Sequence, residues 1–345
     1  MEAEATTIKE TPIIKRIWDR YSVLIILLVI VIAGIAISYS QFPKETESTL
    51  AAAIRHSIPL ILGALCGLLG ERTGVINIGI EGQMLMAAFI GFLVNVYAGN
   101  LLLAVLAGVL TGVFLGAFLA FMSVTLKMDQ IIGGTVINIL AIGITGYFYV
   151  AGLTTQGKLQ PIKLGNLGEL PLVGPVLFKW PPITYLTILL VFVMHYVLFY
   201  TRWGLRSRAV GEHPRAADTV GINVYLMRYV NVAIAGGLAG LAGAYLTLES
   251  VGSFERLMTN GRGFIALAVM IFGRWTPFGA LGAALLFGLA TAAQTQLQFF
   301  GLDIIPHQFV GMLPYVLTII VLAIAGITGR ARPPAAVGQP YEKEG

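Results

Sequence analysis

The sequence predicts an all-α, polytopic membrane protein with about ten transmembrane helices. Hydrophobic residues make up 57% of the 345 residues and charged residues only 11%, whereas a typical soluble domain has roughly 25% charged residues. Apolar stretches long enough to cross a bilayer recur along the chain, and the mean hydropathy is +0.84. Most of the 22 Lys and Arg residues fall between these stretches, which indicates that they set the membrane topology and do not bind nucleic acid.

The first half of the chain alternates apolar stretches with polar segments. Residues 1–20 are polar and include Lys9, Lys15, Arg16 and Arg20, and they precede a first apolar stretch with about the length that one span needs. We therefore expect an uncleaved first helix with its N-terminus in the cytoplasm. The proline-rich loop at residues 153–182 is expected outside. The apolar stretches of this half are residues 21–39, 50–70, 84–98, 101–126, 131–152 and 184–200.

The second half contains one stretch that is short for a full crossing, residues 264–272. Counting it as a span gives ten spans with both termini cytoplasmic, whereas merging it with a neighbour leaves nine spans and an outside C-terminus. The distribution of Lys and Arg favours ten. Residues 21–328 then form one transmembrane domain, and the tail at residues 329–345 is expected to be cytoplasmic and disordered. The other stretches are residues 230–248, 278–297 and 308–327.

Glycine spacing predicts where helices pack closely. Gly108, Gly112 and Gly116 recur every four residues on one predicted span, and the span at residues 230–248 is also rich in glycine. Small residues at this spacing let membrane helices approach each other. Two further stretches, residues 82–88 and 261–268, each run from a glycine-rich break into an apolar segment. Their opposite predicted orientations favour inverted repeats, which place a binding site or pathway at their interface.

A polar, glycine-rich stretch at residues 71–83, ERTGVINIGIEGQ, interrupts the apolar pattern. One interpretation is an ordinary cytoplasmic turn. The other is irregular backbone inside the membrane domain, which is tolerated only where protein buries it or where it lines a cavity. Asn138 lies within a later span, where an amide forms either a helix–helix hydrogen bond or a solute contact. The candidate pathway residues, chosen for polarity beside apolar spans, are Asn77, Glu81, Gln83, Asn138 and Gln294.

Residues 201–223 form a basic island between two apolar stretches. Its interior is typical of two short helices, with Gly211 ending the first and Pro214 in the first turn of the second. Such a cluster is cytoplasmic by the positive-inside rule. It is either a solvated loop that only sets topology or an element, within the loop at residues 201–228, that docks to a soluble partner.

The segment RAVGEHPRAADTVGINV in this island resembles the coupling segment of ATP-binding-cassette importer permeases of the ribose, branched-chain amino acid and nucleoside class. GERTGVINIGIEGQMLMAAF resembles a second motif of that class and is closest to the shorter nucleoside-type permease. The resemblance covers roughly residues 50–328. In that family the first motif docks into the ATPase subunit. It maps here onto Gly211, Glu212, His213, Pro214, Ala216, Ala217, Gly221 and Ile222.

The resemblance implies a non-enzymatic permease in a bacterial or archaeal inner membrane, moving a nucleoside or a sugar. Its implied partners are an ATPase subunit, a second permease of the same or a related chain, and an extracytoplasmic solute-binding protein. The sequence contains no phosphate-binding loop, so ATP would be used by the partner, and we expect no cofactor in this chain. No Cys/His cluster has metal-ligand spacing. An ion-coupled transporter or channel is the alternative, although these need intramembrane charges, and a membrane-embedded enzyme would need a catalytic constellation.

Overall fold

The computed structural model describes residues 33–162, 165–299, 312, 316, 319 and 333–342. The chain divides into two units, residues 1–48 and 49–345. In the first unit the described residues comprise helical residues 33–41 and the beginning of helix α2, and the hydroxyls of Ser38 and Thr46 share a hydrogen bond of 2.8 Å. The second unit holds the helices that position the candidate site.

The described chain is helical, which confirms the predicted all-α class. Thr154 and Ser253 form an isolated β-bridge between two loops. In chain order the helices are α2 (Pro43–Glu71), α3 (Ile80–Ala98), α4 (Leu101–Ala120) with a π-helical continuation (Phe121–Thr125), α5 (Gln130–Tyr147), a 3-10 helix (Gly165–Glu169), α6 (Val173–Leu177), α7 (Pro182–Tyr200), α8 (Arg202–Glu212), α9 (Pro214–Thr219), α10 (Val224–Ala244) with a π-helical continuation (Tyr245–Val251), α11 (Arg262–Phe272) and α12 (Pro277–Phe299).

Seven helices in the described part are long and apolar enough to cross a membrane. They are α2, α3, α4, α5, α7, α10 and α12, with α4 and α10 including most or all of their π-helical continuations. The predicted first and last spans, residues 21–39 and 308–327, lie largely outside the described residues. The short stretch at residues 264–272 falls in α11, which has 11 residues. At 1.5 Å per residue α11 covers about half of the roughly 30 Å hydrocarbon core, so it is not a full crossing by itself.

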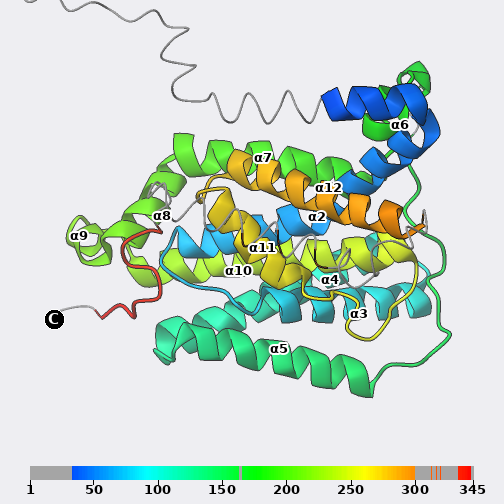
Figure 1. The fold of residues 1–345 in the computed structure, drawn as a ribbon. Helices are drawn as coiled ribbons and strands as arrows, with labels where there is room; N and C mark the ends of the chain where they lie inside the picture. The colour runs from blue at the N-terminus through cyan, green and yellow to red at the C-terminus, as the bar shows by residue number, and fades with distance from the viewer. Residues whose placement is uncertain are drawn as a thin grey trace, which may run out of the picture. The chain divides into compact units, whose positions relative to one another are not determined.

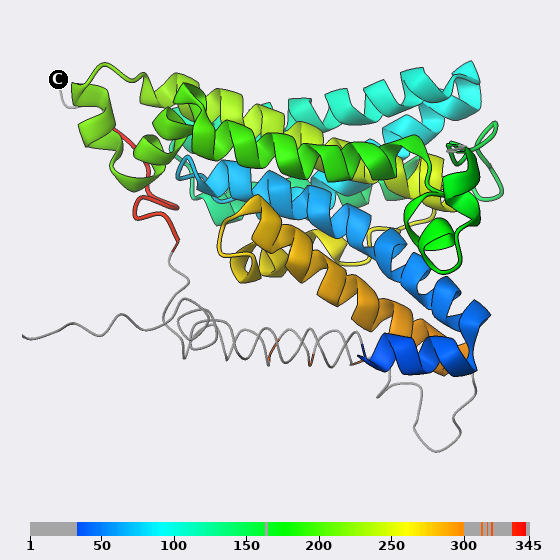
Figure 2. The same ribbon diagram turned by 90° about the horizontal axis from the view of Figure 1, so that it is seen from above.

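In the second unit the long helices run side by side (Figure 1). The short helices α8 and α9 lie at one end of them and α6 lies at the other, and we call these the α9 end and the α6 end (Figure 2). Helices α2, α3 and α10 form the centre, because their membrane-length stretches are mostly buried. Helices α4, α5, α7 and α12 surround them, and less than half of their membrane-length stretches is buried.

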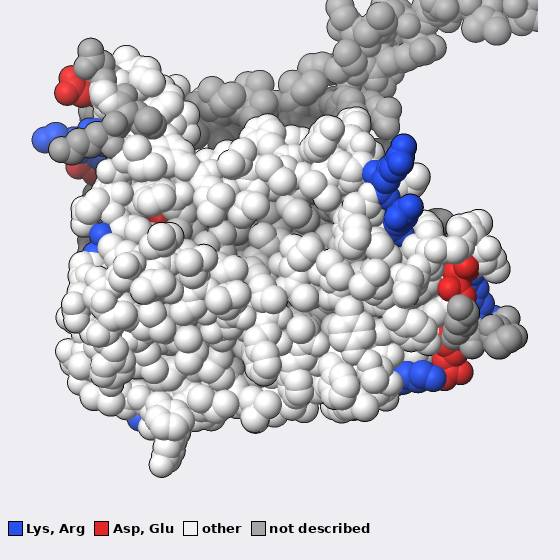
Figure 3. Space-filling view, turned by 180° about the vertical axis from the view of Figure 1, so that it is seen from behind, with Lys and Arg blue, Asp and Glu red and all other residues white. Residues whose placement is uncertain are grey.

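The outer helices present apolar side chains to the surroundings. Leu110 and Phe114 on α4 are 65% and 68% exposed, and Ile139 on α5 is 64% exposed. On the face shown in Figure 3, Lys, Arg, Asp and Glu gather toward the two sides and leave the area between them nearly free of charge. This distribution is what a bilayer requires of a protein surface.

Glycine-to-backbone contact joins α4 to α10, which confirms the predicted close packing. A methyl group on Gly112 would overlap the carbonyl oxygen of Gly236 and lie 2.6 Å from the Cα of Gly240. One turn further along α4, a methyl group on Gly116 would lie 3.0 Å from the Cα of Gly236. The two backbones are therefore too close for any side chain at these positions.

Polar side chains fix where two of these helices start. The Asn100 side-chain oxygen accepts hydrogen bonds from the backbone N–H groups of Leu102 (2.9 Å) and Leu103 (3.1 Å) at the start of α4. Asp129 caps the first turn of α5 in the same way. Each cap satisfies backbone donors that have no partner within the helix, so these polar residues set the two helix boundaries.

Replacing Gly112 by Ala should separate α4 from α10 and lower the free energy of unfolding by roughly 1–3 kcal/mol, as expected for overpacking. The matched control is Gly143→Ala on α5, where an added methyl group would have no neighbour within 4 Å. Thermal unfolding of the purified protein in detergent measures both changes. Equal midpoints for the two variants would contradict the contact between α4 and α10.

Candidate functional site

The glycine-rich stretch folds back into the bundle between α2 and α3. Helix α2 ends at Glu71, and residues 72–79, which we call the glycine-rich loop, are not helical. Asn77 Nδ2 donates hydrogen bonds to Gln83 Oε1 (3.0 Å) and to Cys66 Sγ (3.5 Å). Because Cys66 lies about 7 Å back along α2 from Glu71, the loop runs alongside α2 into the protein. The stretch is therefore buried irregular backbone and not an ordinary turn.

Side chains of α5 replace the backbone partners that this loop lacks. Gly82 N–H donates to Asn138 Oδ1 (2.7 Å), and Asn138 Nδ2 donates to the carbonyl oxygen of Ile78 (3.1 Å). Gln130 Oε1 accepts a hydrogen bond from the Ile76 N–H (2.7 Å). A methyl group on Gly82 would lie 2.7 Å from the Cα of Asn138, so glycine permits the approach. The two amides supply hydrogen-bond partners to backbone groups that have none within a helix.

The carboxylate of Glu81 joins the start of α3 to the start of α11. It accepts hydrogen bonds from the backbone N–H groups of Gly261 (2.8 Å) and Gly263 (2.6 Å). Gly261 has φ +77°, and a methyl group on Gly263 would lie 2.5 Å from the Cα of Glu81. A carboxylate at a helix N-terminus is favoured by the unpaired amides and the helix dipole. Glu81 therefore fixes the position of α11 against α3.

The basic island meets the glycine-rich loop through Gly211. A methyl group on Gly211 would overlap the carbonyl oxygen of Arg72 and lie 2.8 Å from its carbonyl carbon. Arg72 in turn donates to the Trp275 carbonyl oxygen from Nη2 (2.7 Å) and Nε (3.1 Å). Gly211 lies within α8, which continues to Glu212, so the prediction that Gly211 ends the first helix is wrong.

Helix α9 is held by a glycine at its C-terminus. Pro214 occupies its first turn, as predicted. Gly221 has φ +83°, its N–H bonds to the Asp218 carbonyl oxygen (2.9 Å), and the Ile222 N–H bonds to the Ala217 carbonyl oxygen (3.0 Å). This pair of bonds is the Schellman arrangement, which satisfies carbonyl groups that the helix leaves free.

The two alanines of the island face opposite ways. Ala217 is 3% exposed and packs in a cluster with Val210, Met227 and Tyr341, whereas Ala216 is exposed. Val220, just after α9, is 74% exposed. The exposed surface of α9 and the residue after it therefore contains Ala216 and Val220 and does not contain Ala217.

The C-terminal segment Pro333–Glu342, which the sequence predicts to be disordered, lies against this island. Its described residues form hydrogen bonds with α8 and with the glycine-rich loop. Together with the island it encloses a groove of about 670 Å³ at the α9 end. The groove is lined by Glu212, His213, Pro214, Arg215, Ala216, Ala335, Ala336, Gln339, Pro340, Tyr341 and Glu342.

Arg228, the last residue of the predicted loop at residues 201–228, is a central residue that the sequence pattern did not single out. It lies on α10, is 1% exposed, and donates from Nε to the Thr73 carbonyl oxygen (3.1 Å) and from Nη1 to the Gln339 carbonyl oxygen (3.0 Å). Its guanidinium thus joins the glycine-rich loop to the C-terminal segment. An arginine at the start of an apolar stretch was the available signal, because such a charge is retained only where partners satisfy it.

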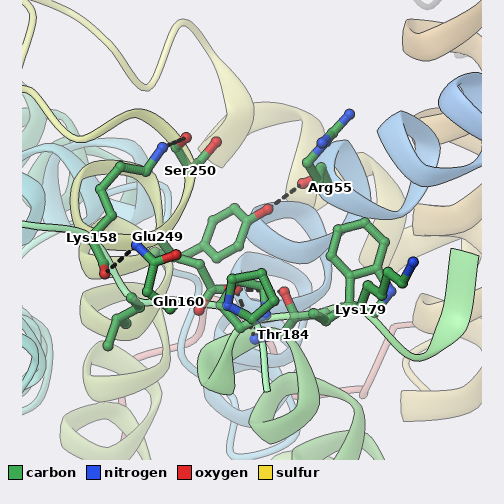
Figure 4. A pocket seen from close by; sticks show the side chains of 12 residues that line it. Arg55, Lys158, Gln160, Lys179, Thr184, Glu249 and Ser250 are labelled. Carbon is green, nitrogen blue, oxygen red and sulfur yellow. Dashed lines mark hydrogen bonds between the residues drawn. The ribbon is translucent and has the colours of Figure 1, made fainter. Parts of the chain in front are cut away.

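A second pocket, of about 340 Å³, lies toward the α6 end (Figure 4). Glu249 lines this pocket and accepts hydrogen bonds from the N–H of Ile183 (2.8 Å) and from the Thr184 hydroxyl (2.6 Å), so it caps α7. Arg55, Lys158 and Lys179 also line it, and Lys158 Nζ donates to the Ser250 carbonyl oxygen (2.8 Å). The pocket wall is therefore rich in cationic side chains.

Comparisons with known proteins agree with these motifs. Residues 49–322 match the family described as the permease component of branched-chain amino acid transport systems. The chain belongs to this permease family. It is accordingly a multi-pass membrane protein and a transport subunit, not an enzyme. No solved structure matches it.

Three relatives cover most of this permease. The guanosine ABC transporter permease protein NupQ of Bacillus subtilis is 41% identical over 308 residues, 85% of this chain and 95% of the relative. The nucleoside ABC transporter permease protein NupC of Lactococcus lactis is 39% identical over 308 residues, 85% of this chain and 96% of the relative. The third relative is a Haloferax volcanii protein named "Putative glucose ABC transporter permease protein TsgC13". It is 36% identical over 320 residues, 86% of this chain and 97% of the relative.

The candidate pathway residues of the permease lie in three places. Asn77, Gln83 and Asn138 lie together around the glycine-rich loop, where Asn77 and Gln83 are fully buried and Asn138 is 8% exposed. Glu81 is half-buried in the first turn of α3, and its carboxylate bonds to the start of α11. Gln294 lies half-buried on α12 and shares none of these hydrogen bonds. In this structure the first group holds the loop in place.

Replacing Asn138 by Leu should destabilise the loop, because the Gly82 N–H and the Ile78 carbonyl oxygen lose their partners. Each buried group left unpaired costs roughly 1–3 kcal/mol. The matched control is Ile139→Ala, one position along α5, where the side chain is 64% exposed. The unfolding temperature and the rate of solute uptake should both be lower in the first variant and nearly unchanged in the second. Wild-type stability of Asn138→Leu would show that the amide does not hold the loop.

Proposed function

We propose that this permease is the membrane-spanning subunit of an ATP-binding-cassette importer that brings nucleosides into the cell. Two of the relatives described above are permeases named for guanosine and for nucleosides. The sequence carries no phosphate-binding loop, so a separate ATPase subunit hydrolyses ATP. An extracytoplasmic solute-binding protein delivers the nucleoside, and a second permease completes the pathway.

The observation that carries this proposal is the geometry of the basic island. Ala216 on α9 and the apolar Val220 just after it are exposed, while Gly211 packs α8 against the backbone of Arg72. A short helix with small and apolar exposed residues can enter a cleft of a soluble partner. The anchoring on Arg72 gives the docked partner a direct mechanical connection to the glycine-rich loop.

In the proposed arrangement the chain crosses the membrane about ten times, with one crossing made by α11 together with the loop before it, and the α9 end and both termini are cytoplasmic. Inverted repeats are supported by the directions of α3 and α11. Both helices begin after a glycine-rich break and meet at Glu81. From there α11 runs to Trp275 at the α9 end, where the Trp275 carbonyl oxygen accepts from Arg72. Helix α3 runs the opposite way, and its end near Val96 contacts the loop that carries Gln156. A pathway at this repeat interface would pass the loop held by Asn77 and Gln83.

The pocket toward the α6 end is then outside the cell, where the solute-binding protein arrives. Its cationic side chains, Arg55, Lys158 and Lys179, suit contact with acidic residues of that protein. Complementary charge at such a rim chiefly speeds association and sets orientation. The exposed apolar residues of the outer helices remain available for lipid and for the second permease.

Replacing Ala216 by Arg should abolish retention of the ATPase subunit, because a long charged side chain would be desolvated in the docked helix. An unpaired buried charge costs several kcal/mol. Ala217→Arg is unsuitable, since Ala217 packs inside the permease. The matched control is Arg206→Ala on the exposed face of α8, where a solvated charge contributes roughly 0–1 kcal/mol.

The measurement is co-purification of the ATPase, followed by uptake of a labelled nucleoside into vesicles with the complete system. Unlabelled nucleosides should compete and unlabelled glucose should not. Equal ATPase retention by Ala216→Arg and Arg206→Ala would contradict docking through α9. Competition by glucose alone would assign the transporter to sugars.

The topology is tested by cysteine labelling. The native Cys66 is fully buried, so it should not react with the thiol reagent. A cysteine replacing the exposed Glu169 should react with an impermeant thiol reagent added from outside, whereas one replacing the exposed Arg215 should react only after permeabilisation. The reverse pattern would place the α9 end outside the cell and exclude ATPase docking there.

A further inference from the structure

The C-terminal segment Pro333–Glu342 lies between the two motifs that the proposed function depends on. The Ala336 N–H donates to the Gly211 carbonyl oxygen (2.9 Å), and the Gly338 N–H donates to the Gly74 carbonyl oxygen (3.1 Å). The two donors are two residues apart, and their acceptors belong to α8 and to the glycine-rich loop. A third bond, from the Ala335 N–H to Glu212 Oε2 (3.1 Å), strengthens the α8 side.

The fit of the segment is specific on the loop side. Gly74 has φ +86°, and a methyl group on it would lie 3.0 Å from the Ala336 carbonyl oxygen and 2.9 Å from Arg228 Nη2. The buried guanidinium of Arg228 donates to both Thr73 and Gln339, so it fastens the segment and the loop to α10. Charge-assisted hydrogen bonds of this kind are about twice as strong as neutral ones.

The fit is also specific on the α9 side. Tyr341 is 6% exposed and packs in one cluster with Val210 of α8 and Ala217 of α9. Its ring lies 5.4 Å from that of Tyr225 at the start of α10. Glu342, next in the chain, pairs with Lys127 in the turn before α5. The segment thus contacts every element that surrounds the docking helix.

We propose that Pro333–Glu342 is a coupling strap: it holds α8 and α9 and the glycine-rich loop as one unit, so that displacement of the docked helix moves the loop. This inference rests on the proposed function, since it presumes that an ATPase docks on α9. Its positioning groups are the N–H groups of Ala336 and Gly338 and the side chain of Tyr341. The strap acts on the loop and does not contact the ATPase through these groups.

The test uses the full transporter reconstituted in lipid, with two altered permeases. One ends at residue 332, and the other carries Tyr341→Ala, which weakens the strap but keeps its backbone. The matched control is Pro333→Ala, at an exposed position of the same segment. Both altered permeases should retain the ATPase within about threefold of the wild-type affinity. The nucleoside moved per ATP hydrolysed should fall roughly tenfold, the size of a typical coupling between two sites.

The outcomes separate this inference from the proposed function. Wild-type transport per ATP in both variants would overturn the strap, and so would loss of ATPase binding, because the segment would then belong to the docking surface. If the truncated chain is not stably inserted, Tyr341→Ala decides by the same ratio. Ala216→Arg is measured in parallel, and its retention of the ATPase would overturn docking on α9 whatever the strap variants do.

Discussion

The backbone of residues 72–79 leaves the helical path between two membrane-length helices, so its polar groups need partners outside the helical pattern. The partners come from elements far apart in sequence. Asn138 and Gln130 on α5, Arg228 on α10 and Gly338 of the C-terminal segment each satisfy one part of the loop. Because these partners converge on one stretch, the packing of the surrounding helices depends on its conformation. The loop is therefore the structural centre of the permease.

Carboxylates inside the bundle have a structural role in this arrangement. Glu81 accepts two backbone N–H groups at the start of α11, and Glu249 does the same at the start of α7. An ion-coupled transporter needs carboxylates that exchange ions or protons during the cycle. Carboxylates whose oxygens accept backbone N–H groups at helix N-termini are poorly suited to that task. Their placement agrees with a permease whose energy comes from another subunit.

The sequence predicted the features that depend on local pattern. Glycine every four residues predicted the contact of α4 with α10, since only glycine lets two backbones approach so closely. Pro214 predicted the start of α9. Clustered glycines and amides predicted that residues 71–83 depart from a plain helix, and the apolar composition predicted the helical membrane class.

Features that depend on tertiary contact could not be predicted from the sequence. Periodicity does not tell which alanine of α9 faces inward, because the neighbour of Ala217 is Tyr341, more than a hundred positions later. The polar tail has the composition of a disordered segment, yet its backbone donors find acceptors on Gly74 and Gly211. Gly211 was mistaken for a helix terminator, since glycine serves both as a helix end and as a point of close approach.

The short length of α11 has a consequence for how the protein is made. A segment of 11 residues is too short to partition into the bilayer as a span when it leaves the ribosome. Its first amides bind Glu81, which lies 180 residues earlier in the chain than Gly261. Helix α3 must therefore already be in the membrane before α11 can settle. Biogenesis of this permease accordingly includes a late step, in which a half-length helix enters a site formed by earlier helices and not by lipid.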